Sequence, residues 1–179
     1  MKIRDRIALL VVLAAAAAPV AKASNLWLHV RVVESGSHPT TVKVNVPYSL
    51  VERAAPLVKD AEIDDGEVVW KGGHVEVTEL RETWRALRSG SGPITRDGAT
   101  WQLVRDGASE TLVVREATPK GAEMRVPAGL VDALLSDGKR LDFEAAVGAI
   151  GRLGSGDLVA VDEDGTRVRI WLDTIPDAE

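Results

Sequence analysis

The chain has 179 residues, no cysteine and a formal net charge of −5 at neutral pH. The absence of thiols excludes disulfides, thiolate metal sites and thiol catalysis. The acidic balance argues against a nucleic-acid partner, because phosphate backbones attract basic surfaces, and the length is sufficient to bury a conventional hydrophobic core.

The first 23 residues have the composition of an export signal. Three basic residues open the chain, an apolar run covers 7–20, and Ala21-Lys22-Ala23 forms a small-x-small cleavage site. The apolar run is shorter than the roughly 20 residues that span a bilayer. We therefore expect a periplasmic or secreted protein that is cleaved before Ser24 and does not insert into the membrane after cleavage. An uncleaved anchor is the alternative.

Alternating residues predict a β-hairpin after the signal. Residues 26–34 alternate with a period of two, the pattern of a half-buried strand. Trp27 and His29 are predicted to lie on the face away from the core. The alternation resumes over 42–46 after a polar loop, and Pro47 ends the returning strand because proline cannot donate a ladder hydrogen bond.

A capping box predicts the first helix. In Ser49-Leu50-Val51-Glu52, the serine hydroxyl can accept a hydrogen bond from the amide three residues later, while the carboxylate reaches back. Pro56 is expected to stop or kink this helix near Ala55, since proline has no amide hydrogen to donate. A short strand at 74–77 and a second helix at 79–88 are expected to follow.

The rest of the chain contains further strand and helix signals. The expected elements are strands at 93–96, 99–105, 111–116, 122–126, 157–162 and 166–172, and helices at about 128–135 and 143–153. Asp97-Gly98 and Asp164-Gly165 are typical of tight hairpin turns, and Asp142 is a suitable helix N-cap. In the last strand, Trp171 is predicted to face away from the core.

The two halves of the chain carry the same motifs in the same order. Residues 44–51 and 124–131 share the pattern apolar-x-Val-Pro-x-x-Leu-Val, and each half also has a Gly-Ser-Gly and an Asp-Gly turn. The expected segments are a signal peptide (1–23) and two repeat modules (24–108 and 109–179). The predicted fold class is α+β: two tandem ββααββ repeats with antiparallel sheets, packed as a pseudo-symmetric pair in one sheet or two. Leu50 and Leu130 are expected to be equivalent core residues.

These motifs resemble those of a group of uncharacterised bacterial exported proteins. The shared features are the opening Leu-x-Val-x-Val-x-Glu strand, the two Val-Pro-x-x-Leu-Val segments and the closing Arg-Val-Arg-Ile-Trp-Leu-Asp strand at 167–173. The resemblance covers most of residues 26–173. It implies an architecture and a compartment, and it carries no catalytic residue.

Patterns for catalysis or metal binding are weak in this sequence. The acidic residues within 60–67 and within 162–164 lack the spacing of a calcium loop. The three histidines, His29, His38 and His74, lack the helical spacing that would suggest a zinc site. We therefore predict no catalytic, cofactor-binding or metal-binding residues and no cofactor.

The expected function is non-enzymatic contact with a protein partner at the cell envelope. The alternative is a small-molecule or glycan-binding module that uses segment 59–77, where the two halves differ most and which contains Trp70 and His74. A hydrolase would require a cavity that holds two carboxylates or a His–carboxylate pair. Trp27 and Trp171 are candidate contact residues, unless another layer covers them as part of a second core. The sequence does not specify the oligomeric state.

Overall fold

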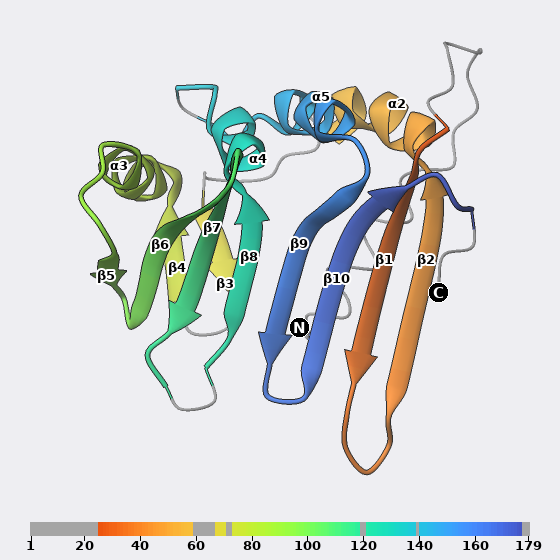
Figure 1. Cartoon of the computed structure of the whole chain (residues 1–179), viewed down its shortest axis with the longest axis horizontal. Helices are drawn as coiled ribbons and strands as arrows, with labels where there is room; N and C mark the ends of the chain where they lie inside the picture. Colours follow the sequence, from red (N-terminus) through yellow and green to blue (C-terminus); the bar gives the residue numbers. More distant parts are fainter. Residues whose placement is uncertain (1–24, 59–66, 71–72, 119–120, 139, 177–179) are drawn as a thin grey trace.

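Eight strands of the chain form one antiparallel sheet, and a separate hairpin forms a two-stranded sheet (Figure 1). The structure is a computed structural model that describes residues 25–58, 67–70, 73–118, 121–138 and 140–176. The elements in chain order are β1 (Trp27–Glu34), β2 (Thr40–Pro47), α2 (Tyr48–Val58), β3 (Glu67–Trp70), β4 (Gly73–Glu76), α3 (Val77–Arg88), β5 (Ile94–Arg96), β6 (Ala99–Asp106), β7 (Ser109–Glu116), β8 (Glu123–Pro127), α4 (Ala128–Leu134), α5 (Phe143–Leu153), β9 (Gly156–Glu163) and β10 (Thr166–Asp173). The predicted α+β class is confirmed.

The strand order of the large sheet interleaves the two halves of the chain. The order is β2-β1-β10-β9-β8-β7-β6-β5, and all neighbouring strands are antiparallel. β1 pairs with β10 along its whole length, whereas β8 pairs with β9 only from Glu123 to Arg125. The strands of 109–179 therefore lie between two groups of strands from 24–108, and the two expected modules share one sheet.

The first half contains a strand that the sequence did not predict. The expected strand at 74–77 corresponds to β4, but β4 pairs with the additional strand β3 in a hairpin outside the large sheet. The first half thus has the order ββαββαββ, while the second half has the predicted order ββααββ. The sequence around β3 is β-prone but only four residues long, which is too short for its period to be recognised.

Both predicted hairpin turns are present. Asp97 and Gly98 have φ angles of 49° and 74°, and Asp164 and Gly165 have φ angles of 32° and 83°. Two successive residues with positive φ are the signature of a type I′ turn, whose twist matches that of antiparallel strands. These turns fix the register of β5 with β6 and of β9 with β10.

The second-half helix α5 begins as predicted. The side chain of Asp142 accepts a hydrogen bond from the amide of Ala145 at 2.8 Å, so Asp142 is the N-cap. One of the amides that a helix N-terminus leaves unpaired is thereby satisfied by the preceding residue.

The predicted bounds of α2 are wrong at both ends. The helix begins at Tyr48, so Ser49 lies inside it, and the Tyr48 amide donates to the Leu26 carbonyl at 2.9 Å. This tertiary hydrogen bond replaces the predicted capping box. At the other end the helix continues through Pro56 to Val58. The proline lies within the last turn, where its missing amide removes a single intrahelical hydrogen bond.

The core lies on one face of the large sheet and has three clusters. The first joins α3 and α4 to β6 and β7 through Trp84, Leu87, Ala99, Trp101, Leu112, Val114, Ala128, Val131 and Leu135. The second joins α2, α4 and α5 to β9 and β10 through Tyr48, Leu130, Ala146, Leu158 and Leu172. The third is built by strands alone, through Val30, Val32 and Val168. The strand registers place these residues on one face, so the alternate residues lie on the other.

Tyr48 fills the junction between α2, α5 and the sheet. Its side chain is completely buried, and its hydroxyl donates to the Val147 carbonyl of α5. A Cβ atom at Gly151 would lie 3.2 Å from the tyrosine ring, so this glycine allows the two helices to approach closely. Figure 1 shows α2 and α5 next to each other along the upper end of the sheet.

The predicted equivalence of Leu50 and Leu130 holds only in part. Leu130 is buried in the second cluster, whereas Leu50 is only half-buried. The first residue of α2 is the bulky Tyr48, whereas the first residue of α4 is Ala128. The tyrosine ring therefore fills part of the second cluster on the side of α2.

Arg81 ties α3 to the connection between α4 and α5. The side chain is 7 % exposed, and it donates to the main-chain carbonyls of Leu135 at 3.4 Å, Gly138 at 2.8 Å and Arg140 at 2.6 Å, as well as to that of Asp137. A buried guanidinium is tolerated when carbonyl oxygens satisfy its donors. The site at the C-terminal end of α4 also has the negative potential that favours a cation.

Candidate functional site

The face of the sheet opposite the core is rich in charged side chains, and we call it the polar face. Its members form three rows that run across the strands. The first row is Lys43, Arg31, Arg169, Ala160 and Arg125, and the second is Asn45, His29 and Trp171. The third row is Arg167, Asp162, Glu123 and Arg115. These residues come from both halves of the chain, because β10 lies between β1 and β9.

Three cations occupy directly opposite positions on β2, β1 and β10, and we call them the cationic row: Lys43, Arg31 and Arg169. Arg169 forms an ion pair with Asp157, with 2.7 Å between Nη2 and Oδ1. Within the described part of the chain, Lys43 and Arg31 form no ion pair, and the buried Nε of Arg31 has no hydrogen-bond partner. The row thus holds two adjacent cations without a counter-charge.

Beside this row, His29 lies in a buried polar network. Its side chain is completely buried, with Nδ1 2.8 Å from Asn45 Oδ1 and Nε2 3.0 Å from Asp173 Oδ1. Its ring stacks on Trp171, with 4.9 Å between the ring centroids. Both ring nitrogens therefore face oxygen atoms within the protein.

Asp173 joins this network to the end of the sheet. It accepts hydrogen bonds from the Ile175 amide at 2.7 Å and from the Trp171 indole at 3.0 Å, in addition to its contact with His29. Burial alone would raise the pKa of Asp173, but the hydrogen bonds from Ile175, Trp171 and His29 outweigh burial and hold this pKa below its usual value.

We expect Asp173→Asn to destabilise the fold at neutral pH by about 1–3 kcal/mol, the range for hydrogen bonds to a charged group. Because the folded-state pKa of Asp173 is lowered, its contribution is present above the unfolded-state pKa of about 3.9 and is lost as the pH falls through the folded-state value. Urea unfolding should therefore show that the difference in free energy of unfolding between the wild type and Asp173→Asn is smaller at about pH 3 than at neutral pH.

The exposed Asp162 provides the matched control for this prediction. Its side chain is 62 % exposed and pairs with Arg167 at 3.2 Å. Asp162→Asn should change stability by less than about 1 kcal/mol at either pH, because solvent screens such pairs. Equal destabilisation by the two variants, or an Asp173→Asn effect that persists unchanged in acid, would contradict the role given to Asp173.

Of the two alternatives for Trp171, an exposed contact residue or a covered side chain, the structure supports the covered one. Trp171 faces away from the core, as predicted, but it is only 7 % exposed because it stacks on His29 and lies under the Arg169 guanidinium, 4.7 Å from the ring centroid. Trp27 lies on the same face and is half-buried. The tryptophans therefore stabilise the polar face from within.

A cavity of about 480 Å³ lies beside the His29 network, and Ser155, Asp157, Arg169 and Asp173 are among its lining residues. Arg169 and Asp157 pair with each other there, and Asp173 is held by the network. This cavity thus holds two carboxylates, Asp157 and Asp173, and each is engaged with partners within the protein. It does not hold a His–carboxylate pair, because His29 is completely buried and is not among the lining residues.

A second cavity, of about 700 Å³, lies where β8 and β9 separate beyond their short pairing. Its charged residues satisfy one another: Arg88 pairs with Glu110 and with Asp132, and Arg105 donates to Glu110. Hydrogen bonds from Arg105 and Arg88 lower the pKa of Glu110. The charges of this cavity are therefore engaged within the protein.

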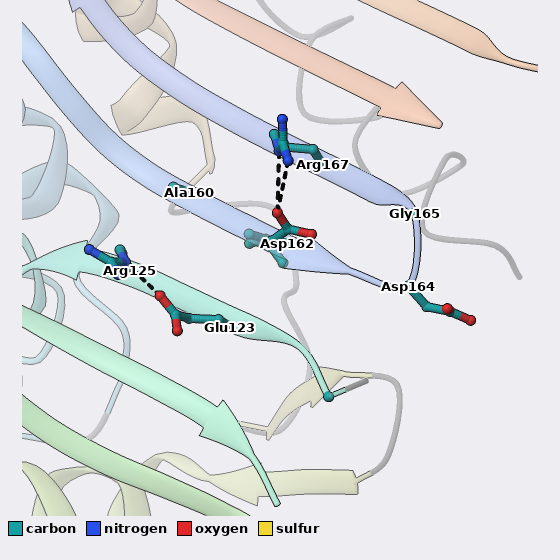
Figure 2. Close-up of a pocket in the computed structure, with 9 residues that line it drawn as sticks. Glu123, Arg125, Ala160, Asp162, Asp164, Gly165 and Arg167 are labelled. Atoms are coloured by element: carbon teal, nitrogen blue, oxygen red, sulfur yellow. Dashed lines mark hydrogen bonds and ion pairs between the residues drawn. The ribbon is translucent and has the colours of Figure 1, made fainter. Parts of the chain in front are cut away.

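A third cavity, of about 650 Å³, opens between the ends of β8, β9 and β10. Figure 2 shows the ion pairs at its rim, Arg125 with Glu123 at 2.7 Å and Arg167 with Asp162 at 3.2 Å, on either side of Ala160. Hydrogen bonds from Arg115 and Arg125 lower the pKa of Glu123. Cations and carboxylates alternate here, in contrast to the cationic row.

The other residues considered from the sequence are not brought into one site. Segment 59–66 lies outside the described residues, as do the side chains of Trp70 and His74. His38 is an exposed residue of the loop between β1 and β2, and it is not among the hydrogen-bond partners of His29. In the described ranges, no group of three or more His, Cys, Asp or Glu residues is arranged to hold a metal ion.

Sequence reasoning placed His29 correctly on the outer face of its strand but missed its partner Asp173. The two residues are 144 positions apart and become neighbours only through the pairing of β1 with β10. No local pattern in the sequence carries this information.

Within the described part of the chain, none of the helices has the length and apolar character needed to cross a membrane. In comparisons with known proteins, this chain matches no family model, no curated protein and no solved structure.

Proposed function

We propose that this chain is an exported, non-enzymatic protein that contacts a protein partner in the cell envelope through β2 and the polar face beside it. The observation that carries the proposal is the position of β2 at the end of the large sheet. β2 is eight residues long, its only described neighbour is β1, and Thr41, Val42 and Lys43 are exposed. A long end strand presents backbone groups to which another strand can bind.

A comparison within the chain supports this role of β2. β2 and β8 both end in Val-Pro, and both lead directly into a helix. β8 lies between β7 and β9, whereas β2 has a described neighbour on one side only. Among the described residues, the edge of β8 is therefore covered by another strand of the chain, whereas the outer edge of β2 is not.

We also propose that the two halves are tandem ββααββ repeats, with the β3–β4 hairpin inserted between α2 and α3 of the first. The sheet order supports this proposal, because the last strand of each half pairs with the first strand of the other, as β6 with β7 and β10 with β1. The pairing of β8 with β9 has no counterpart, since β2 and β5 lie at opposite ends of the sheet. Apart from the inserted hairpin, the repeats thus differ in the neighbours of β2 and β8 within the large sheet.

The surroundings of His29 support the non-enzymatic part of the proposal. Each ring nitrogen faces an oxygen within 3.0 Å, and Trp171 covers one face of the ring. A general base must have a nitrogen within reach of the proton that it abstracts. Using His29 in catalysis would require breaking a buried hydrogen bond, so its arrangement favours a stabilising role.

Export and partner contact can be tested in one experiment. The full chain, with a C-terminal tag and a photo-crosslinking amino acid at exposed Thr41, is expressed in bacteria, fractionated and irradiated. We expect the processed protein to begin at Ser24, to leave the cytoplasm and to form a discrete crosslinked product. The matched control places the crosslinker at Glu82, an exposed position on α3. Retention of uncleaved chain in the cytoplasm, or identical products from both positions, would contradict the proposal.

A further inference from the structure

We propose that the partner segment is an extended acidic chain that adds to the outer edge of β2 and places carboxylates against Lys43 and Arg31. This inference rests on the proposed function, since it names the chemistry of the partner that β2 would contact. It follows from the charges of the polar face, the unsatisfied Nε of Arg31 and the position of β2 at the end of the sheet that the described residues form.

The first argument is the unusual charge pattern of the cationic row. Lys43 lies directly opposite Arg31, and Arg31 lies directly opposite Arg169. Like charges at directly opposite positions of a sheet destabilise the pairing. The chain as a whole is acidic, with 27 Asp and Glu residues against 22 Lys and Arg residues. A row of unneutralised cations on such a protein therefore indicates a surface adapted to an anionic partner.

The second argument is the unsatisfied nitrogen of Arg31. Its Nε is buried and has no hydrogen-bond partner among the described residues. Two carboxylates beside the polar face are already engaged, Asp157 with Arg169 and Asp173 with His29. A buried donor without a partner is costly. The buried Nε itself is out of reach of an added ligand, but Arg31 is only half-buried, so a carboxylate supplied from outside would pair with the rest of its guanidinium and neutralise Lys43 at the same time.

The edge of β2 determines the form of the ligand. A lipid headgroup or a polyphosphate could neutralise the cations, but it would leave the outer backbone groups of β2 unpaired. A second copy of this chain, joined through its own β2, would bring another lysine-bearing strand beside Lys43. An extended acidic polypeptide supplies both a backbone ladder and alternating carboxylates on one face. This combination is the only one of the three that satisfies the edge and the charges together.

The probe is a blocked peptide of alternating threonine and glutamate, as long as the eight-residue β2, added to the mature chain. We expect binding that weakens with added salt and perturbs the amide resonances of β2. Lys43→Ala should weaken binding by about threefold, and Lys43→Ala combined with Arg31→Gln by about tenfold. Arg167→Gln is the matched control, because this exposed cation of the same face already pairs with Asp162, and it should change the affinity by less than about twofold.

Three further ligands decide between the occupants. A peptide of alternating threonine and lysine should not bind, and a peptide of alternating glutamate and proline should bind more weakly than the threonine–glutamate peptide, because proline cannot donate to a ladder. Equal binding by the proline peptide, or preferential binding to phosphatidylglycerol vesicles, would overturn strand addition. If Thr41 forms its specific crosslink while no acidic peptide binds, this inference fails and the proposed function stands. If Thr41 forms none, the proposed function itself fails.

Discussion

Replacing Tyr48 by alanine is expected to lower the free energy of unfolding by about 3–5 kcal/mol, the range for removing a large buried aromatic side chain. Tyr48 is completely buried among Leu130, Ala146, Leu158 and Leu172, so its removal leaves a cavity that helices and strands from both halves would have to close. Urea unfolding followed by tryptophan fluorescence measures the loss. A loss below about 1 kcal/mol would show that the junction of α2, α5 and the sheet repacks without the ring.

Replacing Tyr48 by phenylalanine separates the hydroxyl from the ring. We expect a loss of about 0.5–1.5 kcal/mol at neutral pH, because the hydrogen bond to the Val147 carbonyl is removed. Burial, and next the neighbouring Glu52 carboxylate, raise the pKa of Tyr48 from 10.0 to about 12. Because the pKa is higher in the folded than in the unfolded state, the hydroxyl contributes its full stability at pH values below the unfolded-state pKa. This contribution is lost as the pH rises through the folded-state pKa.

Between pH 10 and pH 12, the free energy of unfolding of the wild type should therefore fall by about 2–3 kcal/mol more than that of the phenylalanine variant. Tyr48 is the only tyrosine of the chain, so the ultraviolet absorbance of tyrosinate follows its titration directly. A midpoint near the ordinary value in the folded protein would show that the hydroxyl is accessible to solvent.

Two glycines of α5 provide a control for the close contact with Tyr48. Alanine normally stabilises a helix interior relative to glycine by about 0.5–1 kcal/mol. At Gly148 the nearest side-chain atom to an added Cβ is Arg152 Nη1 at 3.5 Å, so Gly148→Ala should show this gain. At Gly151 the added Cβ lies 3.2 Å from the Tyr48 ring, so Gly151→Ala should not show this gain in stability. An equal gain at both positions would contradict the close packing.

Replacing Arg81 by alanine is expected to cost at least about 1–3 kcal/mol, the range for leaving buried hydrogen-bonding groups without their partner. The substitution leaves the carbonyls of Leu135, Gly138 and Arg140 without their donor and detaches the α4–α5 connection from α3. Arg81→Lys should recover only part of the loss, because an ammonium group cannot reproduce the planar fork of a guanidinium. Urea unfolding and amide hydrogen exchange at residues 135–138 measure the two effects.

The control for Arg81 lies one turn further along the same helix. Arg85 is exposed, so Arg85→Ala should change the free energy of unfolding by less than about 0.5 kcal/mol. If both variants had the same small effect, the hydrogen bonds of Arg81 to the connection would not contribute to stability. If Arg81→Lys matched the wild type, a single ammonium would be sufficient to hold the connection.

The strands of the large sheet could be predicted from the sequence because their signals are local. Alternating valines mark β1 and β2, and the Asp-Gly pairs at 97–98 and 164–165 mark two of the turns. The order of the strands could not be predicted, because it depends on pairings between residues far apart in the sequence, such as those of β1 with β10. The start of α2 was also missed, since a tertiary hydrogen bond to Leu26 replaces the local cap.

The candidate site was harder to predict than the fold. The polar face draws Lys43 from β2, Arg31 from β1 and Arg169 from β10, so the cationic row exists only when the first and last strands meet. Arg81 is charged and lies on an amphipathic helix, a pattern that predicts an exposed side chain, yet it is buried by carbonyls that come from the other half of the chain. In both cases, partners distant in sequence determine the role of the residue.

The position of β9 and β10 between β1 and β8 has a consequence for how the chain folds. Until residues 156–173 are available, β1 and β2 can form only an isolated hairpin, and β5 to β8 only a separate four-stranded unit. A chain that is synthesised or exported from its N-terminus therefore cannot complete its sheet until the last strand emerges. Pairings between such distant residues form slowly, so we expect closure of the sheet by β10 to be a late step in folding.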